Sequence, residues 1–277
     1  MNNEQLDYSL HYNNWHSKEE KQKEINYFKH LLKDHNFLPD NKDDKVLEIG
    51  TGMGRLLISL KDQGYDNVKG CEIDKGLAKH CFKEGLDIYN GDIIEYLKKI
   101  KEKFDVIYFF DVLEHLPKDQ QIEALSEINK HLSEKGKLIL SVPNALAPLS
   151  HYFENIDWTH HCSFSPHSLS FVLKSSGLFN FTFRPSHQES LEIRKLKKHW
   201  IDLYKAEFNI ENPIMTPSIF ACAFKQKEDL EKYISETASL MNFSESKKKQ
   251  SKVKRIMLHI IACFIPFRKI RKQIRNL

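Results

Sequence analysis

The stretch Lys45-Val-Leu-Glu-Ile-Gly-Thr-Gly-Met-Gly-Arg55 decides the fold of this chain. A short apolar strand pattern leads directly into three alternating glycines, and a helical pattern follows. Glycines let the backbone turn sharply and approach a ligand closely, while a helix start offers N–H groups without helical partners. The stretch therefore predicts a ligand-binding turn between the first strand of an α/β sheet and its helix.

The glycine spacing separates two kinds of nucleotide site. A dinucleotide fingerprint runs Gly-x-Gly-x-x-Gly, whereas this chain has Gly50, Gly52 and Gly54, with Arg55 in place of the last dinucleotide glycine. The spacing therefore disfavours an NAD site.

Strand and helix patterns alternate along most of the chain. We predict strands over 45–49, 68–73, 86–89, 104–110, 137–142, 179–184 and 218–224, and helices over 18–33, 55–62, 76–83, 93–100, 118–131, 166–175 and 191–208. Strands separated by helices imply right-handed crossovers and a mainly parallel sheet with helices on both faces. The predicted fold class is α/β, a Rossmann-like sheet of seven strands.

This pattern divides the chain into four parts. We predict an N-terminal helical segment over 1–44, a ligand-binding domain over 45–225, a helix and linker over 226–250, and a basic amphipathic tail over 251–277. The domain contains an insertion over 185–217, which is either a lid or substrate loop, or a helix packed on the sheet edge.

Charge is distributed unevenly along the chain. The net charge is +4, yet the segment from Lys247 to Leu277 holds 7 Lys, 4 Arg and no acidic residue, so the rest of the chain is acidic. An acidic body disfavours nucleic acid as its partner. The five cysteines form no Cys-x-x-Cys pair and the first residues lack a secretory pattern, so we expect reduced thiols and a cytoplasmic protein.

The motifs resemble those of class I S-adenosylmethionine (SAM) dependent methyltransferases over roughly residues 45–183. The family's first motif, acidic-x-Gly-x-Gly-x-Gly, is matched by Glu48 and the three glycines. The resemblance implies that Glu72, which ends the second strand, binds the ribose hydroxyls of SAM, and that Asp92 contacts the adenine amine. The implied cofactor residues are Glu48, Gly50, Gly52, Gly54, Glu72, Ile73, Asp92, Ile93 and Asp111.

The stretch Asp111-Val-Leu-Glu-His-Leu-Pro117 follows a buried strand. Ligands sit beyond the carboxyl ends of parallel strands, so Asp111, Glu114 and His115 should face the methyl donor. In one interpretation Asp111 lies near the methionine part of SAM and the other two orient the loop. In the other, the pattern resembles the metal site of ubiquinone-pathway and small-RNA methyltransferases, with Asp111 in place of a longer Glu.

A second histidine region, Asp157-Trp-Thr-His-His-Cys-Ser-Phe164, follows the fifth strand. In the metal interpretation, Asp111, Glu114, His115 and His160 hold Mg²⁺, Mn²⁺ or Zn²⁺, which lowers the pKa of an acceptor hydroxyl. Without a metal, His160 or His161 is the preferred general base, and Asp111 and His115 complete the catalytic candidates. Alternatively, one histidine only caps the following helix.

The tail has an apolar run over 256–267 that is too short to span a bilayer. Phe267, Ile270, Ile274 and Leu277 then recur at helical spacing opposite basic residues, which predicts an interfacial helix on an anionic membrane surface. Similar endings occur in bacterial glycan-assembly enzymes. A helix that docks on a partner protein is the alternative, and the apolar stripe disfavours a nucleic-acid tail.

The stretch from Asp157 through Thr159, His160, Phe164, Ser165, Ser168 and Leu169 to Gly177 also resembles the branch of these methyltransferases that is common in bacterial surface-polysaccharide and lipid-quinone pathways and usually methylates oxygen. This resemblance and the tail imply O-methylation of a sugar hydroxyl, in a lipid-linked or nucleotide-linked glycan at the inner face of a bacterial membrane. Methylation of a quinone precursor or RNA ribose is the alternative within enzymes. A non-catalytic SAM-binding assembly protein is the alternative outside them.

Overall fold

The computed structural model describes residues 18–187, 191–210 and 213–242. The chain divides into two compact units, Met1–Ile234 and Ser235–Leu277. The sheet and the site lie in the first unit. Of the second unit, only residues 235–242 are described, so the predicted basic tail lies outside the described residues.

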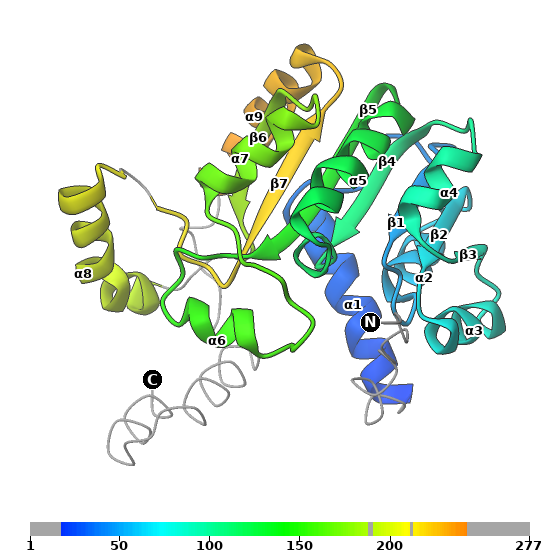
Figure 1. Ribbon diagram of the computed structural model, residues 1–277, viewed down its shortest axis with the longest axis horizontal. Helices are drawn as coiled ribbons and strands as arrows, with labels where there is room; N and C mark the ends of the chain where they lie inside the picture. Colours follow the sequence, from blue (N-terminus) through cyan, green and yellow to red (C-terminus); the bar gives the residue numbers. More distant parts are fainter. Residues whose placement is uncertain (1–17, 188–190, 211–212, 243–277) are drawn as a thin grey trace. The chain divides into compact units, whose positions relative to one another are not determined.

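Seven strands form one sheet in the order β3-β2-β1-β4-β5-β7-β6 (Figure 1). β1 to β5 run parallel, and β7 is antiparallel to both β5 and β6. The strands are β1 (Val46–Ile49), β2 (Val68–Glu72), β3 (Ile88–Asn90), β4 (Phe104–Phe110), β5 (Leu132–Pro143), β6 (Asn180–Pro185) and β7 (Ser218–Phe224). The predicted mainly parallel, Rossmann-like sheet is confirmed.

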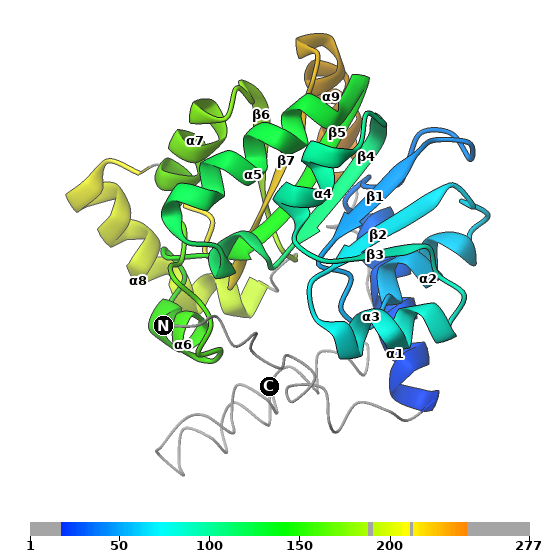
Figure 2. The same cartoon turned by 45° about the vertical axis from the view of Figure 1, so that its right-hand side comes forward.

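Helices cover both faces of this sheet (Figures 1 and 2). They are α1 (Lys18–Asp34), α2 (Arg55–Lys61), α3 (Lys75–Lys83), α4 (Ile93–Lys99), α5 (Lys118–His131), α6 (Ser150–Asn155), α7 (Pro166–Ser175), α8 (Leu191–Phe208) and α9 (Lys227–Asn242), with a 3-10 helix at Leu113–His115. None of the described helices combines the length and the apolar character needed to cross a bilayer.

Two apolar cores, one on each face, hold the helices on the sheet. Alternate residues of β4 enter different cores: Ile107 and Phe109 pack with α4, α5 and α7, and Val106 and Tyr108 pack with α1, α2 and α3. This alternation follows from the two-residue period of a strand. A strand buried on both faces therefore reads as the unbroken apolar run that the sequence shows.

The N-terminal helix α1 packs on α2 rather than forming a separate body. Leu31 and Leu32 lie in the same core as the apolar residues of α2. The buried Arg55 guanidinium, at the start of α2, pairs with Glu24 of α1 at 3.0 Å. The helix that precedes the predicted domain thus supports the helix after the glycine turn.

The register aligns the carboxyl ends of the parallel strands. Ile49 is level with Cys71 of β2 and Phe109 of β4, so the residues after these strands meet at one edge. Because β7 starts beside the end of β5, with Ser218 opposite Pro143, and β6 ends opposite Ile219, the connection that contains α8 joins this edge too. Residues 185–217 therefore enter and leave the sheet at its carboxyl edge.

Four elements differ from the prediction. β5 begins at Leu132 rather than at Lys137, with a register shift between Phe104 and Val106 on β4. β3 is displaced to Ile88–Asn90. The short α6 and the 3-10 helix were not predicted; α6 buries none of its residues, so it leaves no apolar periodicity in the sequence.

Candidate functional site

The turn after β1 requires glycine at three positions. Gly50, Gly52 and Gly54 all have positive φ, at 74°, 51° and 72°, where a side chain is strained. A Cβ at Gly50 would lie 2.3 Å from Cγ2 of Val112, and one at Gly54 would lie 2.4 Å from Cδ1 of Leu86. Both conformation and space therefore keep side chains out of the turn.

Glu72 holds this turn from the neighbouring strand. One carboxylate oxygen accepts the Gly52 N–H at 2.8 Å, and the other accepts the Asp74 N–H at 2.9 Å. Burial raises the pKa of Glu72, and these two hydrogen bonds oppose the rise. The residue expected to bind the ribose of SAM thus lies against the glycine turn.

Glu48 lies within β1, beneath the turn, and is 5% exposed. Its Oε2 has no hydrogen-bond partner. Burial, and then the nearby charge of Glu72, raise the pKa of Glu48 well above its ordinary value. An unsatisfied buried carboxyl is costly, so its retention here fits a binding role rather than a stabilising one.

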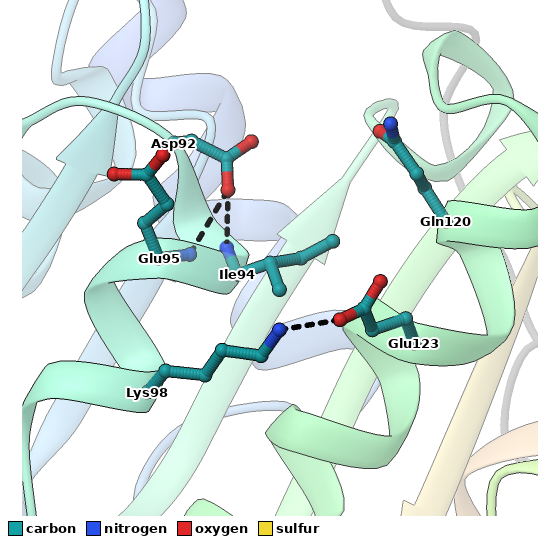
Figure 3. A pocket seen from close by; sticks show the side chains of 6 residues that line it. All are labelled: Asp92, Ile94, Glu95, Lys98, Gln120 and Glu123. Atoms are coloured by element: carbon teal, nitrogen blue, oxygen red, sulfur yellow. Dashed lines mark hydrogen bonds and ion pairs between the residues drawn. The ribbon is translucent and has the colours of Figure 1, made fainter.

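Asp92 follows β3 and begins α4. Its Oδ1 accepts the backbone N–H groups of Ile94 and Glu95 at 2.8 and 3.0 Å, which caps the helix (Figure 3). The Gly91 N–H donates to the Glu72 carbonyl at 3.0 Å, which ties the end of β3 to that of β2. The structure thus places Asp92 beside Glu72, with the side chain of Ile93 buried behind it.

Figure 3 also shows a depression between α4 and α5, lined by Asp92, Ile94, Glu95, Lys98, Gln120 and Glu123. Lys98 and Glu123 form an ion pair across it at 2.5 Å. Only Asp92 belongs to the predicted cofactor residues. We locate the site instead at the strand ends, where the glycine turn, Glu72 and Asp92 meet.

Asp111 ends β4 in a left-handed conformation, with φ of 51°. Such a conformation is uncommon for a residue other than glycine and concentrates at functional sites. The Ser141 hydroxyl donates to its carboxylate at 2.9 Å, and the Asp111 N–H donates back to the Ser141 carbonyl at 3.1 Å. These hydrogen bonds hold Asp111 against β5, at the carboxyl edge of the sheet where we expect the methyl donor to bind.

A second cluster forms where the loops after β4 and β5 meet. Glu114, His115 and His160 each offer a ligand atom, and these atoms lie within 4.8 Å of one another. Glu114 Oε1 is 4.0 Å from His160 Nε2, and the two imidazole rings meet edge to face at 4.6 Å. The structure therefore brings together three of the four predicted metal residues, and Asp111 is not in the group.

Burial controls the charge of this cluster. It lowers the pKa of His115 to about 4, aided by His160, so this imidazole is neutral at physiological pH. Burial also raises the pKa of Glu114 well above its ordinary value, and the charge of Asp111 adds to this. Glu114 is 1% exposed and its Oε2 has no hydrogen-bond partner.

These residues fit a divalent metal by donor type. Carboxylate and imidazole are ligands for Mg²⁺, Mn²⁺ or Zn²⁺. Glu114 Oε2, which has no hydrogen-bond partner, offers one such ligand atom. His160 Nδ1 lies 3.0 Å from the Glu154 carbonyl, which can only accept, so Nδ1 carries a proton, and in the neutral ring the lone pair is on Nε2. Such a backbone contact commonly orients a ligating imidazole.

His161 is separate from this cluster. Its backbone N–H donates to the Glu114 carbonyl at 2.8 Å, while its side chain is exposed. Thr159, for which the sequence indicates no role of its own, instead contacts His115 at 2.7 Å. In the sequence, the only sign that Thr159 contacts a histidine is its place between Asp157 and the pair His160-His161.

We therefore expect the two adjacent histidines to differ in their effect on turnover. His160→Ala removes an imidazole from the cluster and should lower kcat by about 100-fold or more, the usual contribution of a positioned proton acceptor. His161→Ala should leave kcat close to wild type. Single-turnover assays at saturating donor test this, and equal losses in both variants would contradict the assignment.

Comparison with known proteins is consistent with this geometry. Residues 21–181, more than half of the chain, match the family described as "Methyltransferase domain". This region spans α1, the glycine turn, the Glu114 cluster and the first residues of β6.

Curated relatives match a smaller part. A ribosomal protein L11 methyltransferase from Lactobacillus johnsonii is 33% identical over 105 residues, which are 36% of this chain and 31% of that protein. An uncharacterized methyltransferase from Staphylococcus carnosus is 28% identical over 116 residues, 42% of this chain and 53% of that one. The chain thus spans about a third of the length of the L11 methyltransferases it matches.

Solved structures share the fold. A SAM-dependent methyltransferase from Archaeoglobus fulgidus superposes with a TM-score of 0.59 at 20% identity, over 78% of this chain and 99% of that one. A methyltransferase solved with the Trm112 activator of Haloferax volcanii gives 0.55 at 13% identity, over 76% and 96%.

Proposed function

Since this chain belongs to the methyltransferase domain family and has the class I SAM-dependent methyltransferase fold, we propose that it methylates a sugar hydroxyl of a bacterial surface glycan or its lipid-linked or nucleotide-linked precursor. One observation carries the choice of oxygen as the acceptor atom. A neutral imidazole, His115, and a second imidazole, His160, meet a buried carboxyl at the donor edge of the sheet.

The donor half of the site supports SAM as the methyl source. Glu72 offers a carboxylate beside the glycine turn, where two oxygens suit the vicinal hydroxyls of a ribose. Asp92, which follows the next strand, β3, suits an adenine amine, and its second oxygen is not used in the helix cap. Asp111, directly after β4, is the third carboxylate that we assign to the SAM site, and it accepts a hydrogen bond from Ser141.

The reaction is an in-line displacement at the sulfonium methyl group. The acceptor oxygen forms the new C–O bond and the C–S bond breaks. The hydroxyl proton is accepted by an imidazole nitrogen of the cluster formed by Glu114, His115 and His160. A hydroxyl is a poor nucleophile until its proton is accepted, so a nearby imidazole nitrogen is needed at that moment. Glu114 is placed to stabilise the imidazolium that forms, because its carboxyl lies 4.0 Å from His160.

Glu114, His115 and His160 would also hold a divalent metal, with His160 Nε2 directed to it by the Glu154 contact. Such an ion would lower the pKa of the acceptor hydroxyl. The residues perform the same task either way: they orient the hydroxyl and receive its proton. The basic tail over 251–277, outside the described residues, is proposed to hold the enzyme at an anionic membrane surface.

The test is methyl transfer from labelled SAM into a membrane extract that contains nucleotide sugars, with Glu72→Gln as the inactive control. We expect label in a lipid-extractable or nucleotide-linked glycan with wild type and none with the variant. Label in RNA, a quinone or a protein would overturn the sugar assignment. SAM binding without transfer to any of these fractions would indicate a non-catalytic assembly protein.

A further inference from the structure

A chain of three hydrogen-bonded groups leads from a carboxylate to the catalytic cluster. Asp157 Oδ1 accepts the backbone N–H of Thr159 at 2.8 Å and its hydroxyl at 2.6 Å. The same hydroxyl oxygen lies 2.7 Å from Nδ1 of His115. The Thr159 side chain therefore stands between Asp157, in its own loop, and His115, in the loop after β4.

The protons in this chain can be assigned. The Thr159 hydroxyl has one proton, and Asp157 is acceptor-only when ionised, so that proton points to the carboxylate. The hydroxyl oxygen can then only accept from Nδ1 of His115, and Nδ1 must carry the imidazole proton. In a neutral ring this leaves the lone pair on Nε2.

We infer that Thr159 is a positioning residue that selects the His115 tautomer with the proton on Nδ1 and the lone pair on Nε2. The inference rests on the proposed function, because only a ring with an Nε2 lone pair can accept a hydroxyl proton or bind a metal there. Asp157 acts one step further out, by fixing the direction of the Thr159 hydroxyl.

The selection matters because a neutral imidazole can carry its proton on either nitrogen. The opposite tautomer would present an N–H at Nε2, which can neither take a proton nor ligate a metal. At His160, Nδ1 meets the backbone carbonyl of Glu154, which can only accept, whereas His115 has the Thr159 hydroxyl beside a backbone hydrogen bond with the same residue. The two histidines of the cluster thus reach the same proton arrangement by different contacts.

A purely structural role for Thr159 makes a different prediction. If the residue only packs the loop, Thr159→Val, which keeps the branched shape, should be neutral, and Thr159→Ser, which loses a methyl group, should be harmful. If the hydroxyl selects the tautomer, the order reverses. Ser163→Ala is the matched control, since it removes another hydroxyl-to-carboxylate hydrogen bond, to Glu154, from the same loop.

The first readout is the His115 tautomer, measured by long-range ¹H–¹⁵N NMR on the full-length protein without substrate. We expect Nδ1 protonation in wild type, Thr159→Ser and Ser163→Ala, and a mixed or reversed tautomer in Thr159→Val. An unchanged tautomer in Thr159→Val overturns the inference. Because this readout needs no methyl transfer, its failure is distinguishable from a failure of the proposed function.

The second readout is methyl transfer. Thr159→Val should lower kcat by about 10- to 100-fold, the usual effect of losing the group that orients a histidine, with the KM for SAM unchanged. Thr159→Ser should restore kcat to near wild type. Equal kcat in Thr159→Val and wild type, or no rescue by Ser in a folded variant, would overturn the catalytic part of the inference.

Discussion

Glu72→Gln should weaken SAM binding by about 100-fold or more, the largest loss of donor affinity that we expect from one atom exchange. The carboxylate now accepts two backbone N–H groups, from Gly52 and Asp74. The amide of glutamine replaces one of these oxygens with an NH₂ donor, which must then face one of the two backbone N–H donors. A charge-assisted hydrogen bond is worth about 1.5–3 kcal/mol, so loss of one to a ribose, together with an NH₂ group that faces a backbone N–H, corresponds to this change in Kd.

Isothermal calorimetry of SAM association measures this effect directly. Glu84→Gln is the matched control, because Glu84 forms a 2.6 Å ion pair with Lys21 at the end of α3 and takes no part in the glycine turn. That variant should keep wild-type affinity. A Glu72→Gln protein that binds SAM as wild type does would remove the ribose role from Glu72.

Glu114→Gln should lower kcat by about 100-fold or more and leave SAM affinity unchanged. The amide keeps the size of the side chain but cannot ionise, so it can neither stabilise an imidazolium by charge nor supply a carboxylate to a metal. Rapid-quench methyl transfer at saturating SAM measures the loss. A variant with wild-type kcat would exclude Glu114 from the chemistry.

The same variant should gain stability relative to wild type as pH rises. The pKa of Glu114 is higher in the folded than in the unfolded protein, so between these two values the folded protein binds more protons. Wild-type stability therefore falls with rising pH across that interval, by about 1.4 kcal/mol per pH unit from this group. Glutamine does not titrate, so the variant lacks this loss.

Urea unfolding of both proteins at pH 5.5 to 8.5 tests this sign. The difference in unfolding free energy, variant minus wild type, should increase with pH above about 4.5 and level off above the folded-state pKa of Glu114. A difference that is constant with pH would show that Glu114 titrates alike in both states.

The positions of the glycine turn, Glu72 and Asp92 could be predicted from the sequence because each depends on local pattern and sheet topology. Gly50, Gly52 and Gly54 are needed for left-handed turns, and Glu72 and Asp92 follow strands whose ends must meet at one edge. These rules need no knowledge of loop conformation. The sheet itself followed from apolar runs buried on both faces, such as β4.

The acceptor half could not be predicted in the same way. His160 and His161 are adjacent, and only the path of an irregular loop turns one into the cluster and the other to solvent. Asp111 was grouped with the metal candidates because of its place in a motif, yet its carboxylate accepts from Ser141, a contact between β4 and β5. Thr159 shows no periodic or compositional signal at all.

The antiparallel placement of β7 has a consequence for how such an enzyme diversifies. The connection over 185–217 leaves and rejoins the sheet at one rim, so it can lengthen, shorten or change its chemistry without shifting the register of Pro143 against Ser218. The glycine turn, Glu72 and Asp92 lie at the ends of β1, β2 and β3, on the other side of the sheet order. A change in the length or chemistry of this one connection would therefore leave the pairing of β5, β7 and β6 in place.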